Sequence, residues 1–172
     1  MHAAFRYVFA GLLLVFLDFR IGGFDLLPDF VGWALVAYGA LQLTSFGKGF
    51  FVAGCLAAPL AVFDVIFLLA GNSIPLLGYF VAVVHCACIW TLLGGIADVA
   101  IVSQRHELAL SATKLRVVYV AIISASVLLG SLFQSTNDSL AMLIGGALAI
   151  AALITVVFIL RLVYRAGSKL PF

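Results

Sequence analysis

Residues 74–102 have the sequence IPLLGYFVAVVHCACIWTLLGGIADVAIV, in which Asp98 is the one residue of the Asp, Glu, Lys and Arg group. A helix of this length rises roughly 43 Å at 1.5 Å per residue, whereas the hydrocarbon core of a bilayer is about 30 Å thick. It can therefore cross a membrane if it tilts or if one end projects into water. This stretch predicts a transmembrane helix and makes the bilayer the solvent in which the chain folds.

The rest of the chain has the same character. Of its 172 residues, 66% are apolar and 9% are charged, and the mean hydropathy is +1.30. Soluble domains carry about 25% charged residues, so this chain has too little polar surface to face water. The composition excludes a soluble globular domain, a disordered tail and a nucleic-acid-binding protein. We therefore expect a lipid bilayer, and no nucleic acid, among its partners.

Glycines, prolines and short polar loops divide the chain into six apolar stretches. We predict an all-α, polytopic transmembrane helical bundle, a single membrane domain with spans at about 3–19, 26–46, 50–70, 74–102, 112–133 and 140–160. Asp25 is predicted to cap the second span, with Asp29 near the positive end of its dipole. Ser111 is predicted to cap the fifth span.

The basic residues of this predicted bundle lie almost entirely on one side. With six spans, both chain ends, the loop at Lys48 and the polar segment 103–114 share that side. It holds eight of the nine Lys and Arg residues: Arg6, Lys48, Arg105, Lys114, Arg116, Arg161, Arg165 and Lys169. Arg20 is alone on the opposite side. Because Lys and Arg accumulate in cytoplasmic loops, this distribution predicts that the N- and C-termini are both cytoplasmic.

Polar residues within the spans are the first candidate functional residues, because a charge at the bilayer centre costs about 2.5–3.5 kcal/mol on insertion scales. Asp64 lies in the third span, and His85 and Asp98 lie in the fourth. One face of the fourth span, an arc of about 140°, collects its small and polar residues, namely His85, Cys88, Thr91, Gly95 and Asp98. This face is predicted to point into the bundle.

Two interpretations of this face remain open. It is the wall of a solute site or proton path in which His85 titrates, or it is a helix-packing face. In the second interpretation Cys88 and Gly95 allow close approach and His85 bonds a neighbouring helix. His85 and Cys88 could also ligate a metal, but Cys86 points about 100° away and no second helix offers a matching pair. We therefore predict no metal site and no cofactor.

A second group of charged residues lies between the first two spans, on the side opposite the basic one. Its members are Asp18, Arg20, Asp25 and Asp29. The group is either an entry site for a cation or polar solute, or a solvated loop in which Arg20 pairs with an aspartate while the other carboxylates cap the second helix.

The same segment carries a sequence resemblance. Residues 24–33, FDLLPDFVGW, follow a short span that ends in LDFRIGG. This pattern resembles that of a family of small uncharacterised bacterial multipass membrane proteins, which have a segment like FDLLPDFIGY between their first two spans. Val31 and Trp33 stand where the pattern has Ile and Tyr. The resemblance covers roughly residues 1–45 and implies a location in a bacterial inner membrane, but it implies no activity.

These observations lead to three hypotheses. In the first, the protein transports or binds a small solute, with Asp64 and His85 facing an internal cavity and the loop aspartates near its mouth. In the second, it is a non-catalytic accessory or assembly subunit whose small-residue faces contact a membrane partner or a second copy of the chain. These faces carry Gly54 and Ala58, Ala121 and Ala125, and Ala141, Gly145 and Ala149. A membrane enzyme comes third.

Overall fold

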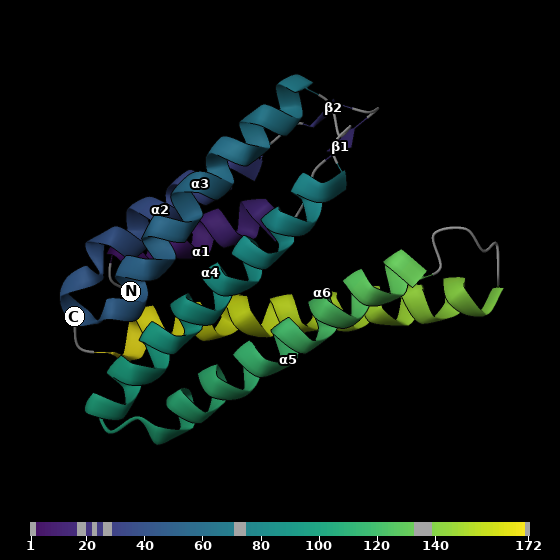
Figure 1. The fold of residues 1–172 in the computed structure, drawn as a ribbon. Helices are drawn as coiled ribbons and strands as arrows, with labels where there is room; N and C mark the ends of the chain where they lie inside the picture. The colour runs from purple at the N-terminus through teal and green to yellow at the C-terminus, as the bar shows by residue number, and fades with distance from the viewer. Residues whose placement is uncertain are drawn as a thin grey trace.

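The computed structural model describes residues 3–16, 20–21, 24–25, 29–70, 75–132 and 139–170. These residues form a helical bundle, so the prediction of an all-α fold is confirmed (Figure 1). Its helices are α1 (Ala3–Phe16), α2 (Asp29–Gln42), α3 (Lys48–Ala70), α4 (Pro75–Val102), α5 (His106–Leu132) and α6 (Ser139–Lys169). A 3-10 turn, η1 (Thr44–Phe46), precedes α3, and two short strands, β1 (Arg20–Ile21) and β2 (Phe24–Asp25), pair antiparallel between α1 and α2.

Four of the described helices are long and apolar enough to cross a membrane. The segments concerned are Lys48–Ile66, Gly78–Val102, His106–Leu129 and Met142–Lys169. Helices α1 and α2 have 14 residues each. A 14-residue helix rises about 21 Å, less than the hydrocarbon thickness of about 30 Å. Helix length and composition therefore support a membrane protein with four candidate spans among the described residues.

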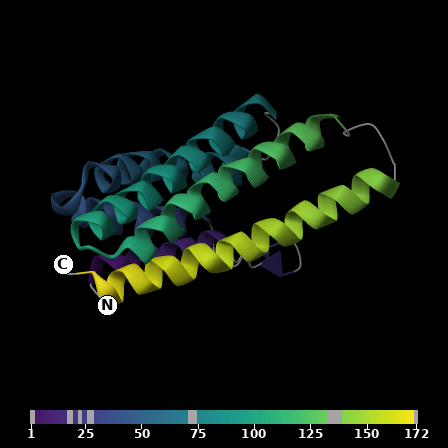
Figure 2. The same ribbon diagram turned by 90° about the horizontal axis from the view of Figure 1, so that it is seen from below.

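Consecutive helices run in opposite directions, so the bundle has two ends (Figures 1 and 2). At the basic end, α1 begins, α2 connects to α3, α4 connects to α5, and α6 ends. The basic end carries Lys48 in the first turn of α3, Arg105 between α4 and α5, and Lys169 in the last turn of α6. The opposite end, which we call the hairpin end, carries β1 and β2.

Helices α1 and α2 touch through their backbones. A Cβ atom on Gly11 would lie 2.4 Å from the carbonyl oxygen of Gly32, and one on Gly39 would lie 2.6 Å from that of Ala4. Helices α3 and α4 approach in the same way, because a Cβ on Gly49 would lie 2.8 Å from the backbone nitrogen of Gly95. Small residues allow such contacts, and close packing replaces the hydrophobic driving force that helices lack in lipid.

The buried core lies among α1–α4 and reaches only the basic-end halves of α5 and α6. Among the described side chains, the buried residues of α5 are Ala109, Ala112 and Tyr119, and those of α6 all lie between 155 and 167. Toward the hairpin end, large apolar side chains such as Leu128, Leu143 and Ile150 are exposed. In a bilayer, these surfaces face lipid or another protein.

The structure corrects three details of the sequence-based boundaries. Helix α5 begins at His106, so Ser111 is not a cap; it lies within the helix, where its hydroxyl donates to the carbonyl oxygen of Glu107 at 2.8 Å. The helix is instead initiated where the Arg105 carbonyl accepts the N–H groups three and four residues ahead. Asp25 belongs to β2, whereas α2 begins at Asp29. Helix α6 runs past residue 160 to Lys169. Its last turns can extend into the membrane interface because the long side chains of Arg and Lys place their charged groups in water.

Candidate functional site

Two polar side chains form a hydrogen bond between α4 and α5. Both lie in the segments of these helices that are long and apolar enough to cross a membrane. The hydroxyl of Tyr119 and Nε2 of His85 share a hydrogen bond of 3.0 Å. Tyr119 is 2% exposed, and His85 is half-buried. An imidazole or a phenol without a partner is costly in an apolar medium, so each of these groups stabilises the other there.

Aromatic rings from two further helices surround this pair. The ring of Trp33 on α2 meets the His85 ring edge to face, with centroids 4.8 Å apart, and Phe16 on α1 stacks on His85 at 6.1 Å. The Phe16 ring also lies 6.3 Å from that of Tyr119. Four helices thus build one enclosure, which we call the His85 site: His85, Tyr119, Phe16 and Trp33.

The His85 imidazole retains hydrogen-bonding capacity. Its Nε2 is occupied by Tyr119, while its Nδ1 makes no hydrogen bond with any of the residues that the structure describes. His85 is half-buried, and its ring packs against those of Trp33 and Phe16. A neutral imidazole offers either a donor or an acceptor at Nδ1, depending on its tautomer.

The remaining members of the predicted α4 face have three different environments. Cys88 is buried and its thiol donates to the carbonyl oxygen of Ala53 on α3 at 3.4 Å, and Gly95 packs against the ring of Phe50. The hydroxyl of Thr91 donates to carbonyl oxygens of its own helix. Helix packing is therefore the role that the contacts of Cys88 and Gly95 support. Asp98 is exposed, so the prediction that it points into the bundle is wrong.

Asp64 lies at a different depth from His85. Cys88 lies opposite Ala53, and the Phe80 ring contacts the Phe63 ring at 5.7 Å, which sets the register of α3 on α4. At 1.5 Å per residue, this register puts half-buried Asp64 roughly 10 Å closer to the hairpin end than His85. The two residues that were expected to share a cavity are thus separated along the helix axes.

The charged group between α1 and α2 is described only in part. Arg20 and Asp25 are backbone partners in the antiparallel β1–β2 ladder. Asp29 opens α2 and is half-buried, so its predicted place near the positive end of the helix dipole is confirmed. Asp18 lies outside the described residues.

Similarity to other proteins does not identify this site. The chain matches no known protein family, no curated protein and no solved structure. Within the described part of the chain, no group of three or more His, Cys, Asp or Glu side chains could hold a metal ion. The chemistry of the site is therefore argued from its own atoms, namely a ring nitrogen, a hydroxyl and the faces of aromatic rings.

Sequence reasoning missed Tyr119, Phe16 and Trp33. Tyr119 is the one Tyr in the fifth predicted span, and a phenol inside an apolar helix is a usable signal because it needs a hydrogen-bond partner. Phe16 and Trp33 carried no such signal, since aromatic residues also gather at membrane interfaces.

Proposed function

We propose that the protein is a multi-pass membrane protein that binds a small solute at the His85 site and transports it. The observation that carries this proposal is the hydrogen bond between His85 and Tyr119, formed within apolar helices and leaving Nδ1 of His85 available. Ionisable residues inside membrane segments are costly, and they commonly mark solute or proton pathways. The solute would contact Nδ1 through a hydrogen-bonding group and the rings of Phe16 and Trp33 through an apolar or planar part.

The proposal also assigns a path to the solute. Asp64 and Asp29 lie toward the hairpin end, where Arg20 and Asp25 pair across the strands. A solute that enters from the hairpin end would pass these carboxylates before it reaches His85. Asp98 is exposed on α4 near the basic end, so in this scheme it would lie at the exit.

The proposed topology is six spans in a bacterial inner membrane, with both chain ends in the cytoplasm. The accumulation of Lys and Arg at the basic end supports this orientation. Helices α1 and α2 are short, but four spans and six spans are both even numbers, so the two chain ends share a side in either case. The resemblance of residues 24–33 to a family of bacterial multipass proteins agrees with the proposed location.

Topology reporters test this orientation. A reporter inserted at residue 72 should lie on the opposite side of the membrane from one fused after Phe172, and one at residue 104 should lie with the latter. The expected difference is nearly all or none when alkaline phosphatase and fluorescent-protein activities are compared at each site. Equal activities at residue 72 and at the tail would refute the proposed topology.

Ligand retention tests the binding proposal. The detergent-purified protein would be incubated with a polar extract of bacterial cells, and retained solutes would be identified by mass spectrometry. We expect at least one solute that wild type retains and that both His85→Gln and Tyr119→Phe lose about tenfold, because one hydrogen bond to a buried group contributes roughly 1.5 kcal/mol. Tyr79→Phe is the matched control, since Tyr79 lies on α4 and is exposed.

A retained solute then allows a transport assay. Proteoliposomes should accumulate it, and Asp64→Asn should abolish uptake without lowering the amount of folded protein. If no solute distinguishes wild type from the two site variants while all remain folded, the proposed binding role is wrong.

An accessory role is the second candidate, and one surface favours it. A Cβ atom on Gly145 or Gly146 of α6 would have nothing within 4 Å, so this small-residue face is uncovered in the single chain. Such faces allow close approach of another helix. Co-purification of a second membrane protein, or of a second copy, that is lost in Gly145→Leu would support this role in place of transport.

A further inference from the structure

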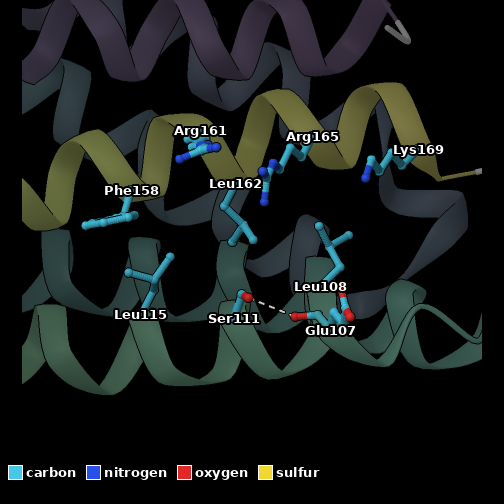
Figure 3. A pocket seen from close by; sticks show the side chains of 9 residues that line it. All are labelled: Glu107, Leu108, Ser111, Leu115, Phe158, Arg161, Leu162, Arg165 and Lys169. Atoms are coloured by element: carbon cyan, nitrogen blue, oxygen red, sulfur yellow. Dashed lines mark hydrogen bonds between the residues drawn. The ribbon is translucent and has the colours of Figure 1, made fainter.

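A cavity of about 260 Å³ lies between the first turns of α5 and the last turns of α6, at the basic end of the bundle (Figure 3). It involves none of the residues of the His85 site. Pockets for drug-sized ligands measure about 300–1,000 Å³, so this one suits a chemical group such as a headgroup rather than a whole large molecule.

The polar wall of the cavity is strongly cationic. Arg161, Arg165 and Lys169 line it from α6, and Glu107 is its one acidic residue. Their spacing of four residues puts the three cations on one face of the helix, where like charges repel one another. Among the described residues, no ion pair joins Glu107 to any of them. An anion bound between the two helices would remove this repulsion.

The opposite part of the cavity is apolar. Leu115 on α5 and Phe158 on α6 line it on the side toward the bundle centre, whereas Lys169 lies at the basic end of α6 (Figure 3). The apolar run of α6 ends at Leu160, immediately before the first of its three cations. In a bilayer whose hydrocarbon core ends near Leu160, the cavity would span the boundary at which acyl chains give way to lipid phosphates.

We propose that this cavity binds a phosphate-bearing anion, held by Arg161, Arg165 and Lys169. Guanidinium groups bind phosphate oxygens in a bidentate manner, and a lysine contributes a point charge. Free phosphate would use only the cationic wall, whereas an anionic phospholipid would also lay its acyl chain against Leu115 and Phe158. The two-part wall favours the lipid headgroup.

Titration of the purified full-length chain in detergent tests the proposal, with native mass spectrometry as the readout. The probes are dihexanoyl-phosphatidylglycerol, which is anionic, dihexanoyl-phosphatidylcholine, which is zwitterionic, and sodium phosphate. We expect phosphatidylglycerol to bind at least tenfold more tightly than phosphatidylcholine. The double variant R161Q/R165Q should weaken phosphatidylglycerol binding by about 20–30-fold, since each basic residue near an anionic lipid surface contributes roughly a factor of five.

The matched control is R105Q/K114Q. It removes two cations from the same region of the molecule that do not line the cavity, and it should change binding by less than twofold. Equal losses in the two double variants would mean that surface charge alone attracts the lipid, and would overturn the site. Equal binding of the two lipids would overturn it as well.

Two further variants test the cavity independently of its arginines. Ser111→Trp fills the cavity without changing its charge, so it should abolish binding even if R161Q/R165Q fails to fold. Glu107→Gln removes the one negative charge of the wall and should tighten binding about twofold. If sodium phosphate binds at this site as tightly as phosphatidylglycerol, the cavity is a phosphate site but its assignment to a lipid is wrong.

Discussion

Gly11→Ala should lower the free energy of unfolding by about 3 kcal/mol relative to Gly145→Ala. The added methyl group of Gly11→Ala would lie 2.4 Å from the carbonyl oxygen of Gly32, and the nearest side-chain atom, on Val36, lies at 2.8 Å. Since the closest atom belongs to the backbone, no rotamer change relieves the clash, and α1 must move away from α2. Equilibrium unfolding in mixed micelles of dodecyl maltoside and SDS measures the difference.

Gly145→Ala is the control because a Cβ at this position would have nothing within 4 Å. Both variants change glycine to alanine within a helix, so both gain the same propensity, about 1 kcal/mol, and the same restriction of the unfolded chain. Their difference isolates the contact between α1 and α2. Indistinguishable unfolding curves would show that the two backbones do not touch in the folded protein.

Phe50→Ala should destabilise the protein by about 2–3 kcal/mol, whereas Phe51→Ala should cost less than about 1 kcal/mol. Phe50 is 0% exposed, its ring lies edge to face with that of Phe5 at 6.1 Å, and it fills the space beside Gly95. The transfer free energy that drives burial in water is absent in lipid, so the expected cost is that of the cavity and the lost dispersion contacts. The same unfolding assay measures both variants.

Phe51, the next residue in the chain, is a closely matched control for Phe50. Phe51 has the same side chain on the same helix but is 54% exposed, so its loss leaves no internal cavity. Equal destabilisation by the two substitutions would contradict the described orientation of α3 toward α1 and α4. A large loss for Phe51→Ala alone would indicate that the exposed face of α3 is covered by another protein.

The two candidate sites lie at different depths and involve different chemistry. The His85 site lies within the membrane-like segments and is lined by aromatic rings, whereas the cationic cavity lies at the basic end. Helix α5 contributes to both, through Tyr119 and through Ser111, two helical turns apart. A lipid bound in the cavity would therefore stabilise the helix that holds the phenol of the His85 site.

The sequence alone determined that lipid is the solvent of this protein and that its backbone is helical. Long apolar runs require that every backbone polar group be satisfied within its own segment, so composition and run length specify the long helices without knowledge of their neighbours. The sequence also determined that Lys and Arg collect at one end of the bundle, because consecutive helices alternate in direction and the basic residues lie at the chain ends and in every second connection. His85 and Asp64 could be named as candidates since polar residues are rare within such runs.

Only the tertiary structure decided which of those residues meet. Tyr119, Phe16 and Trp33 reach His85 from three other helices, and the cationic cavity exists because α5 and α6 lie side by side. The helical periodicity put Asp98 on the same face as His85, but the structure leaves it exposed, because an arc of about 140° is wide enough to meet both a neighbouring helix and the surroundings. The physical reason is that helices in lipid associate through close packing of small residues such as Gly11, Gly32 and Gly95, a matter of shape between distant segments that no local pattern encodes.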